Sequence, residues 1–237
     1  MGKRLAIGIF GFLALLAMLF CALYSMGVIT IESREEVAYR ADDFGSLYTG
    51  WLIGGVKEGY GEITYIDGSV YKGYFENGEY SGQGAYTDAA GWTYNGGFKS
   101  GLPEGNGTFT DTNGGVFFGV FEAGKITGEG VFYPPDGWTY DGMWDQGRQV
   151  GEGVFTYEDG SIYTGGFLDG AASGFGFYQD AAGWSYEGGF LQGLFEGQGT
   201  LTFDDGETLE TEWVAGAPQQ STEVSQKLAE DEEPGAE

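Results

Sequence analysis

The feature that most constrains this chain is a period of 23 residues that holds from residue 48 to residue 208. An aromatic residue opens each of the seven copies: Tyr48, Tyr71, Tyr94, Phe117, Tyr140, Tyr163 and Tyr186. A truncated eighth copy begins at Leu209 and has Thr211 where the others have glycine. A chain that repeats this strictly stacks one small unit many times. We therefore expect function in the surface of an array and not in a single catalytic pocket.

Each copy is predicted to be a β-hairpin when its residues are numbered as positions 1 to 23. Positions 3, 8, 12, 14 and 21 are glycine in all seven copies, while positions 1, 5 and 16 are aromatic or large and apolar. A spacing of two at positions 1, 3, 5 and at 14, 16, 18 is typical of strands. The glycines at 8 and 12 bracket a loop, and the glycine at 21 marks a second turn. The fold class is therefore an all-β repeat of antiparallel hairpins.

Glycines inside strands suggest a register for these hairpins. If the hairpin folds about positions 9 and 10, position 5 faces position 14 and position 3 faces position 16. If the second turn folds about position 21, position 16 also faces position 3 of the next copy. Each large side chain would then cover a glycine on a neighbouring strand, which explains glycines that otherwise weaken a strand. The opposite face, with recurring threonine and acidic residues, is expected to face solvent.

An uncharged segment, residues 5–31, follows Lys3 and Arg4 and precedes the array. A helix of that length exceeds the roughly 30 Å hydrocarbon core of a bilayer. The segment is also longer than the apolar region of a cleaved signal peptide, and no clean small-residue cleavage site follows it. We predict one transmembrane signal anchor at 5–27, after a cytoplasmic N-terminus at 1–4. A cleaved signal peptide is the alternative.

The segments on either side of the array complete the expected organisation. The basic pair before the span lies tight against it, whereas Arg34 sits among acidic residues, so the array at 48–216 is expected to be extracytoplasmic, either periplasmic or luminal. A juxtamembrane linker is predicted at 28–47. A disordered tail is predicted at 217–237, which contains the acidic run at 230–233 and few apolar residues.

Residue content and charge exclude several classes of function. The chain has no His, and its one Cys, Cys21, lies in the apolar segment, so Cys/His zinc sites and His-based catalysis cannot be built. The net charge is −26, and the seven full copies hold 23 Asp or Glu against 5 Lys or Arg. That charge opposes binding to nucleic acid and to anionic lipid. We predict no enzyme activity, no cofactor and no metal site.

The pattern Y-x-G-x-F-x-x-G-x-x-x-G-x-G-x-F followed by a turn, seen at 71–91 and 140–160, resembles the MORN repeat (membrane occupation and recognition nexus) over residues 48–208. The resemblance implies an elongated, twisted, single-layer antiparallel sheet without catalysis by the repeats. It also implies a scaffold or adaptor, often at a membrane, and a homodimer in some members. The lipid binding attributed to some members is not expected here, because the last two copies have no basic residue.

Two sets of aromatic residues are candidates for binding a partner. Trp92, Trp138 and Trp184 occupy position 22 of alternate copies and would form a row along one edge, although each could instead cover its own glycine-rich turn. Part of the apolar stripe would also remain uncovered by a single layer, and its alternative role is packing. The candidates in the stripe stand at position 5: Phe75, Phe98, Phe121, Trp144, Phe167 and Phe190.

These observations favour a membrane-anchored, non-catalytic scaffold that binds a protein partner through the array. The alternative is an extracytoplasmic module that binds carbohydrate or cell wall, since Trp and Tyr recur along the array.

Overall fold

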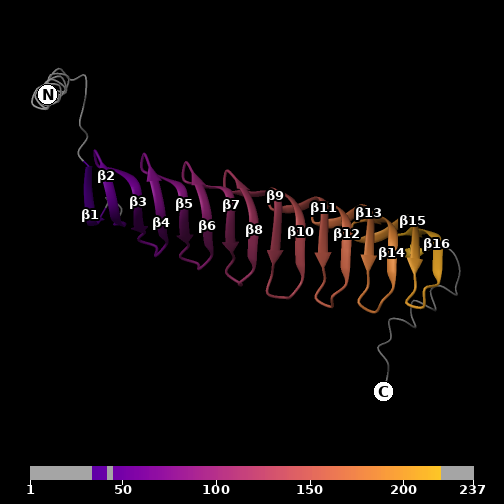
Figure 1. Ribbon diagram of the computed structural model, residues 1–237. Coiled ribbons are helices and arrows are strands. Elements are labelled where there is room, and N and C mark those ends of the chain that lie inside the picture. Colours follow the sequence, from indigo (N-terminus) through magenta and orange to yellow (C-terminus); the bar gives the residue numbers. More distant parts are fainter. Residues whose placement is uncertain (1–33, 42–44, 220–237) are drawn as a thin grey trace, which may run out of the picture.

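The computed structural model describes residues 34–41 and 45–219, which form one antiparallel sheet of 17 strands (Figure 1). The strands lie side by side in an elongated row, and none of the described residues is helical. The prediction of an all-β array of tandem hairpins is confirmed. Among the described residues there is accordingly no helix that could cross a bilayer. The span predicted at 5–27 and most of the tail predicted at 217–237 lie outside them.

The strands alternate between two lengths through the array. The sheet begins with β1 (Arg34–Ala41) and ends with the two-residue strand β17 (Ala217–Pro218). The first strands of the hairpins have seven residues each: β2 (Leu47–Ile53), β4 (Val70–Glu76), β6 (Thr93–Lys99), β8 (Val116–Glu122), β10 (Thr139–Asp145), β12 (Ile162–Leu168), β14 (Ser185–Leu191) and β16 (Thr208–Val214). The returning strands have nine: β3 (Val56–Thr64), β5 (Glu79–Thr87), β7 (Leu102–Thr110), β9 (Lys125–Tyr133), β11 (Arg148–Thr156), β13 (Ala171–Gln179) and β15 (Leu194–Thr202).

Each strand pairs with the strands before and after it in the chain, so the sheet is a meander. Strand β1 lies within the segment 28–47 that was predicted to be a linker, and it pairs antiparallel with β2. The sequence gives no repeat signature there, so this extra edge strand was not predicted. It covers the first edge of the array, which β2 would otherwise present unpaired.

Each hairpin turns at positions 7 and 8. In the second repeat these are Asn77 and Gly78, with φ of 52° and 84°, and the same pair of left-handed residues recurs at every later hairpin. Two successive left-handed residues define the two-residue type I′ turn, which matches the twist of the flanking strands. The amide of Gly78 also donates to the carbonyl of Lys57 at 3.0 Å, and the equivalent bond links each later hairpin tip to the one before it.

The predicted register is wrong, because the turn lies at positions 7 and 8 and not at 9 and 10. Position 3 pairs with position 14 (Gly73 with Gly84), and position 1 pairs with position 16 (Tyr71 with Tyr86). Across the second turn, Tyr86 pairs with position 1 of the next repeat and not with position 3. Glycine therefore lies opposite glycine in every full repeat.

The aromatic residue at position 1 covers this glycine pair. A Cβ atom built on Gly73 or on Gly84 would lie 2.5 Å from the hydroxyl oxygen of Tyr71. That hydroxyl donates to the carbonyl oxygen of Tyr74 at 2.8 Å, and every tyrosine at position 1 makes the same bond to position 4. Phe117 occupies the same place without a hydroxyl. The idea that aromatics cover glycines is right, but the covering residue stands at position 1.

The core is a ladder of aromatic rings that runs along the array. Tyr71 meets Phe75 of its own repeat and Phe98 of the next one edge to face, each at 5.1 Å between ring centroids. The same zigzag continues from Tyr48 to Trp213. Such edge-to-face pairs add to the stability that burial provides. Each repeat is thereby fixed to its neighbours by side chains as well as by the backbone.

The glycine pairs give a direct test of this packing. Gly153→Ala should destabilise the protein by about 3 kcal/mol, because the new methyl group would overlap the Tyr140 ring, whose hydroxyl lies 2.6 Å from its position. Tyr140→Phe, which removes only a hydrogen bond, should cost about 1 kcal/mol. Urea unfolding measures both free energies. A Gly153→Ala protein as stable as the parent would contradict the packing.

Candidate functional site

The three tryptophans at position 22 lie on the aromatic face, which we define as the face that carries positions 1, 5 and 16. Trp92 is half-buried between Tyr86 and Phe109, at 5.1 and 5.7 Å between ring centroids. Trp138 likewise stacks on Phe155 of the next repeat at 5.1 Å. Trp184 contacts Tyr178 and Phe195. Each tryptophan thus lies between rings of successive repeats and still has exposed surface.

The candidates at position 5 lie deeper. Their relative exposures fall between 3% and 8%, since they form the ladder: Phe75, Phe98, Phe121, Trp144, Phe167 and Phe190. The indole N–H of Trp144 donates to the carbonyl oxygen of Gly130 at 2.9 Å, so its polar atom is already bonded. Of this set, only Phe98 also lines the pocket described next.

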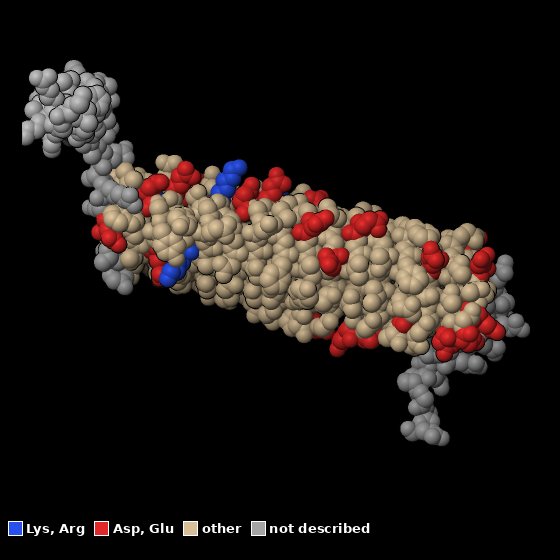
Figure 2. Space-filling model, viewed as in Figure 1, with Lys and Arg blue, Asp and Glu red and all other residues tan. Residues whose placement is uncertain are grey.

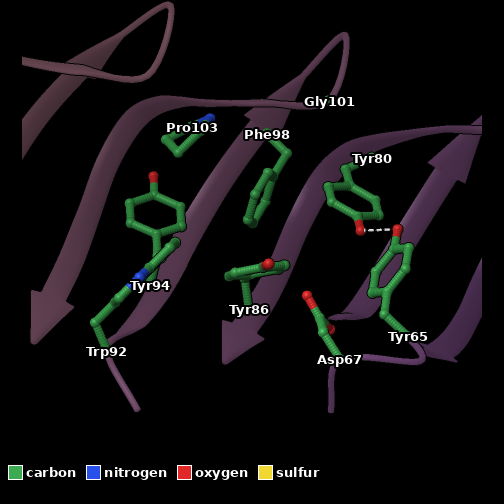
Figure 3. Close-up of a pocket in the computed structure, with 9 residues that line it drawn as sticks. All are labelled: Tyr65, Asp67, Tyr80, Tyr86, Trp92, Tyr94, Phe98, Gly101 and Pro103. Carbon is green, nitrogen blue, oxygen red and sulfur yellow. Dashed lines mark hydrogen bonds between the residues drawn. The ribbon is translucent and has the colours of Figure 1, made fainter. Parts of the chain in front are cut away.

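A pocket of about 390 Å³ opens on the aromatic face where the first three full repeats meet (Figure 3). Its base consists of the buried rings of Tyr94 and Phe98, and its walls are the half-buried rings of Tyr80, Tyr86 and Trp92. The remaining lining residues are Tyr65, Asp67, Gly101 and Pro103. The structure brings together Trp92 and Phe98, which sequence analysis had placed in two separate sets.

The polar groups of the pocket lie at its rim. The hydroxyls of Tyr65 and Tyr80 are hydrogen-bonded to each other, which joins two repeats across the opening (Figure 3). Asp67 is exposed, and Figure 3 shows its carboxylate directed between Tyr65 and Tyr86. One carboxylate oxygen accepts the backbone N–H of Ser69 at 2.8 Å, and this bond fixes the turn. The pocket therefore combines an aromatic interior with one negative charge at its mouth.

The residue at position 10 differs between the two repeats that border the pocket. In the second repeat this residue is Tyr80, which stacks on Tyr71 at 3.7 Å between ring centroids. In the third repeat it is Pro103, which pairs with Phe98 across the hairpin and is too small to cover Tyr94 in the same way. The space above Tyr94 is the pocket.

The tyrosines of the aromatic face are held in their neutral form. Burial raises the pKa of Tyr94 to about 12. Burial raises the pKa of Tyr80 further, and the hydrogen bond with Tyr65 adds to that rise. Burial likewise raises the pKa to about 12 in Tyr71, Tyr140, Tyr163, Tyr178 and Tyr186. At neutral pH these hydroxyls donate hydrogen bonds and carry no charge, so the formal charge among the lining residues is that of Asp67.

Sequence analysis named Trp92 and Phe98 as candidates but missed the other residues of this pocket, among them Tyr65, Asp67, Tyr80 and Pro103. These four stand at positions 18, 20 and 10, all of which vary between copies. The wrong register also placed position 10 in the turn, away from the aromatic stripe. The variation at position 10 is the signal that could have indicated an interruption of the face.

Charge is unevenly distributed over the surface. Figure 2 shows a broad uncharged area along the middle of the array, with most Asp and Glu toward its long edges and its C-terminal end. Two exposed ion pairs, Lys72 with Glu62 and Arg148 with Asp169, are present in the part of the chain that the structure describes. Within residues 34–41 and 45–219, no group of three or more Asp, Glu, Cys or His side chains could hold a metal ion.

Comparison with known families agrees with the repeat boundaries. The model of the MORN repeat matches residues 48–70, 71–93, 94–116, 117–139, 140–162, 163–185 and 186–208. No curated protein matches the sequence of the chain. Among solved structures, the SAS-4 TCP domain of Drosophila melanogaster in complex with a proline-rich motif of Ana2 is 11% identical, with a TM-score of 0.43, over 78% of this chain and 98% of that one. The TCP10 domain of Danio rerio CPAP in complex with a STIL peptide is 13% identical, with a TM-score of 0.25, over 76% and 100%.

The buried tyrosines predict loss of stability at alkaline pH. The pKa of Tyr140 is raised from 10.0 to about 12, so its stabilising effect is complete below pH 10 and is lost as the pH rises toward 12. The free energy of unfolding in urea should therefore fall across that interval. Tyr140→Phe should make the fall shallower, because one titrating group is removed. A free energy that is constant from pH 10 to pH 12 would contradict the assignment.

Proposed function

We propose that this chain, which belongs to the MORN repeat family, is a non-catalytic scaffold that holds a protein partner against the aromatic face of its array. The supporting observation is that the array covers this face incompletely. The rings at positions 16 and 22 of the central repeats keep exposed surface, and a pocket opens among them. Aromatic residues supply most hot spots in protein interfaces.

The incomplete cover follows from the architecture. A globular domain packs a second layer over the apolar side of its sheet. Here the described strands form one sheet, and the residues that cover the ladder are those at positions 10 and 22 of the same array. Tyr80 and Trp92 are half-buried for that reason. A partner segment lying along the array would bury surface that this fold leaves in contact with water.

The residues present favour binding over catalysis. The chain has no His to act as a base at neutral pH. Burial keeps the hydroxyls of Tyr80 and Tyr94 protonated, so they are poor nucleophiles and poor bases. The pocket contains a single carboxylate, Asp67, whereas glycoside hydrolysis uses a pair.

We further propose that residues 5–27 anchor this scaffold in a membrane with the array on the extracytoplasmic side. The support comes from the sequence: residues 5–31 carry no charge, and Lys3 and Arg4 stand directly before them. A tethered array would hold its partner at the membrane surface.

The scaffold role predicts that a partner is lost when the aromatic face is altered. Proximity labelling from the array in intact cells should recover a reproducible protein partner. Replacing Trp92, Trp138 and Trp184 together with alanine should reduce its recovery about tenfold or more, because hot-spot aromatics contribute about 2 kcal/mol or more each.

A matched control removes exposed aromatics from the opposite face. Tyr74, Phe118 and Phe175 are exposed, with relative exposures of 51%, 48% and 69%. Their replacement by alanine should leave recovery of the partner unchanged. Circular dichroism must show that both triple variants are folded. The proposal fails if deletion of residues 48–216 changes no association. Retention of the full-length chain on insoluble polysaccharide, without any protein partner, would instead favour a carbohydrate-binding module.

The orientation of the anchor can be measured separately. A reporter fused after Glu237 should be active when the reporter requires export and inactive when it requires the cytoplasm. Exchange of Lys3 and Arg4 for glutamate should weaken that preference, since basic residues next to a span favour the cytoplasm. Reporter activity confined to the cytoplasm would contradict the proposed side of the membrane.

A further inference from the structure

We propose that the pocket formed by Tyr80, Tyr86, Trp92, Tyr94 and Asp67 binds a lysine or arginine side chain from an extended, basic segment of the partner. This inference rests on the proposed function, because it names the chemistry by which the array would recognise a protein. It assigns the pocket a cation with an apolar stem, surrounded by aromatic rings and neutralised by one carboxylate.

The array already contains one lysine placed in this way. Lys57 stands at position 10 of the first repeat, and its ammonium nitrogen lies 5.8 Å from the centroid of the Tyr48 ring. At the same position of the second repeat, Tyr80 stacks on Tyr71. In the third repeat Pro103 leaves the corresponding ring, Tyr94, beside the open pocket. A cationic side chain from a partner would take the place that Lys57 has in the first repeat.

A second cluster, 92 residues later in the chain, has a ring where the pocket has Pro103. Tyr65, Asp67, Tyr86, Trp92, Tyr94 and Phe98 correspond in sequence to Tyr157, Asp159, Tyr178, Trp184, Tyr186 and Phe190. Phe195 stands there in place of Pro103, and it stacks on Tyr186 at 3.8 Å between ring centroids and 12° between ring planes. The two clusters share these six residues but differ at position 10 of both repeats, where Ala172 replaces Tyr80 and Phe195 replaces Pro103. The ring at position 10 therefore stacks on Tyr71 in the first cluster and on Tyr186 in the second.

Charge selects a cation over other ligands that an aromatic pocket accepts. A Lys or Arg head group is attracted by the faces of Tyr and Trp rings, and more strongly where water is excluded. The carboxylate of Asp67 lies at the mouth of the pocket, and one of its oxygens accepts the Ser69 amide in the turn. The seven repeats hold 23 acidic against 5 basic residues, which attracts a basic segment and repels an acidic one.

The side chains of Lys and Arg suit a pocket with aromatic walls and a carboxylate at its mouth. Their methylene stems can pack against Tyr80 and Tyr86, and the carboxylate of Asp67 attracts the head group as it enters. The backbone of the ligand would then remain outside the pocket and could follow the array toward Trp138.

The test measures binding of fluorescent peptides to the full-length chain purified in mild detergent. The probe is an extended peptide in which lysine alternates with glycine. Matched peptides carry arginine, acetyl-lysine, glutamate or proline in place of lysine. Fluorescence anisotropy gives the dissociation constants, and each titration is repeated at raised salt. The lysine and arginine peptides should bind, and the acetyl-lysine peptide should bind about tenfold more weakly, because its charge is absent.

Two variants test the pocket without removing any of its rings. Pro103→Phe introduces over Tyr94 the ring that Phe195 places over Tyr186, and it should weaken binding of the lysine peptide about tenfold or more. Asp67→Asn removes the charge but keeps an oxygen for the Ser69 amide, and it should weaken binding about threefold to tenfold. The matched control is Asp159→Asn. Asp159 accepts the amide of Ser161 at the same distance of 2.8 Å, and its substitution removes the same charge. It should leave the dissociation constant unchanged.

Each other outcome overturns the inference in a recognisable way. An equal loss in Asp67→Asn and Asp159→Asn would mean general attraction by the acidic array and no specific pocket. A proline peptide that binds as tightly as the lysine peptide and is insensitive to Asp67→Asn would identify an apolar ligand. If Pro103→Phe changes the dissociation constant of no peptide while proximity labelling still depends on the aromatic face, the inference fails and the scaffold function stands. If the array proves dispensable for every association, both fail.

Discussion

The structure depends on one contact, in which the ring at position 1 lies flat over two paired glycines. In the fifth repeat the Tyr140 ring covers Gly142 and Gly153, and neither position has room for a Cβ atom. The ring is therefore held against the backbone, where its hydroxyl reaches the carbonyl oxygen of Met143. Because the ring is fixed there, it meets Trp144 and Phe167 edge to face and links one repeat to the next. The sheet thereby acquires a core without a second layer.

Because the sheet has no second layer, its aromatic face is only partly covered. Residues at positions 10 and 22 help to cover the ladder, and the residue at each of these positions differs between copies. Where position 10 holds a large ring, as in Phe195, the face is closed over Tyr186. Where it holds Pro103, a pocket remains beside Tyr94. A periodic scaffold can in this way carry a non-periodic site, lined by residues that differ between repeats.

Much of this fold follows from the sequence, and the parts that do not have identifiable causes. Five constant glycines and three apolar positions predict tandem hairpins, and the structure confirms them. The predicted register was wrong because residues such as Ala123 and Gln146 adopt a left-handed conformation in the turn, which their residue types do not predict. Trp92 and Phe98 were found as candidates because they recur with the period. Asp67 and Pro103 were missed because a site built from three neighbouring repeats depends on contacts that no single copy contains.

The central claim is that the aromatic face, and not its reverse, meets the partner. The most direct measurement replaces Trp92 or Phe175 singly with the photo-crosslinking residue p-benzoylphenylalanine in the full-length chain in cells. Both positions carry aromatic side chains, and Phe175 is the more accessible, at 69% exposure on the opposite face. We predict that light will cross-link the partner from position 92 and not from position 175. Cross-linking from position 175 alone would contradict the account.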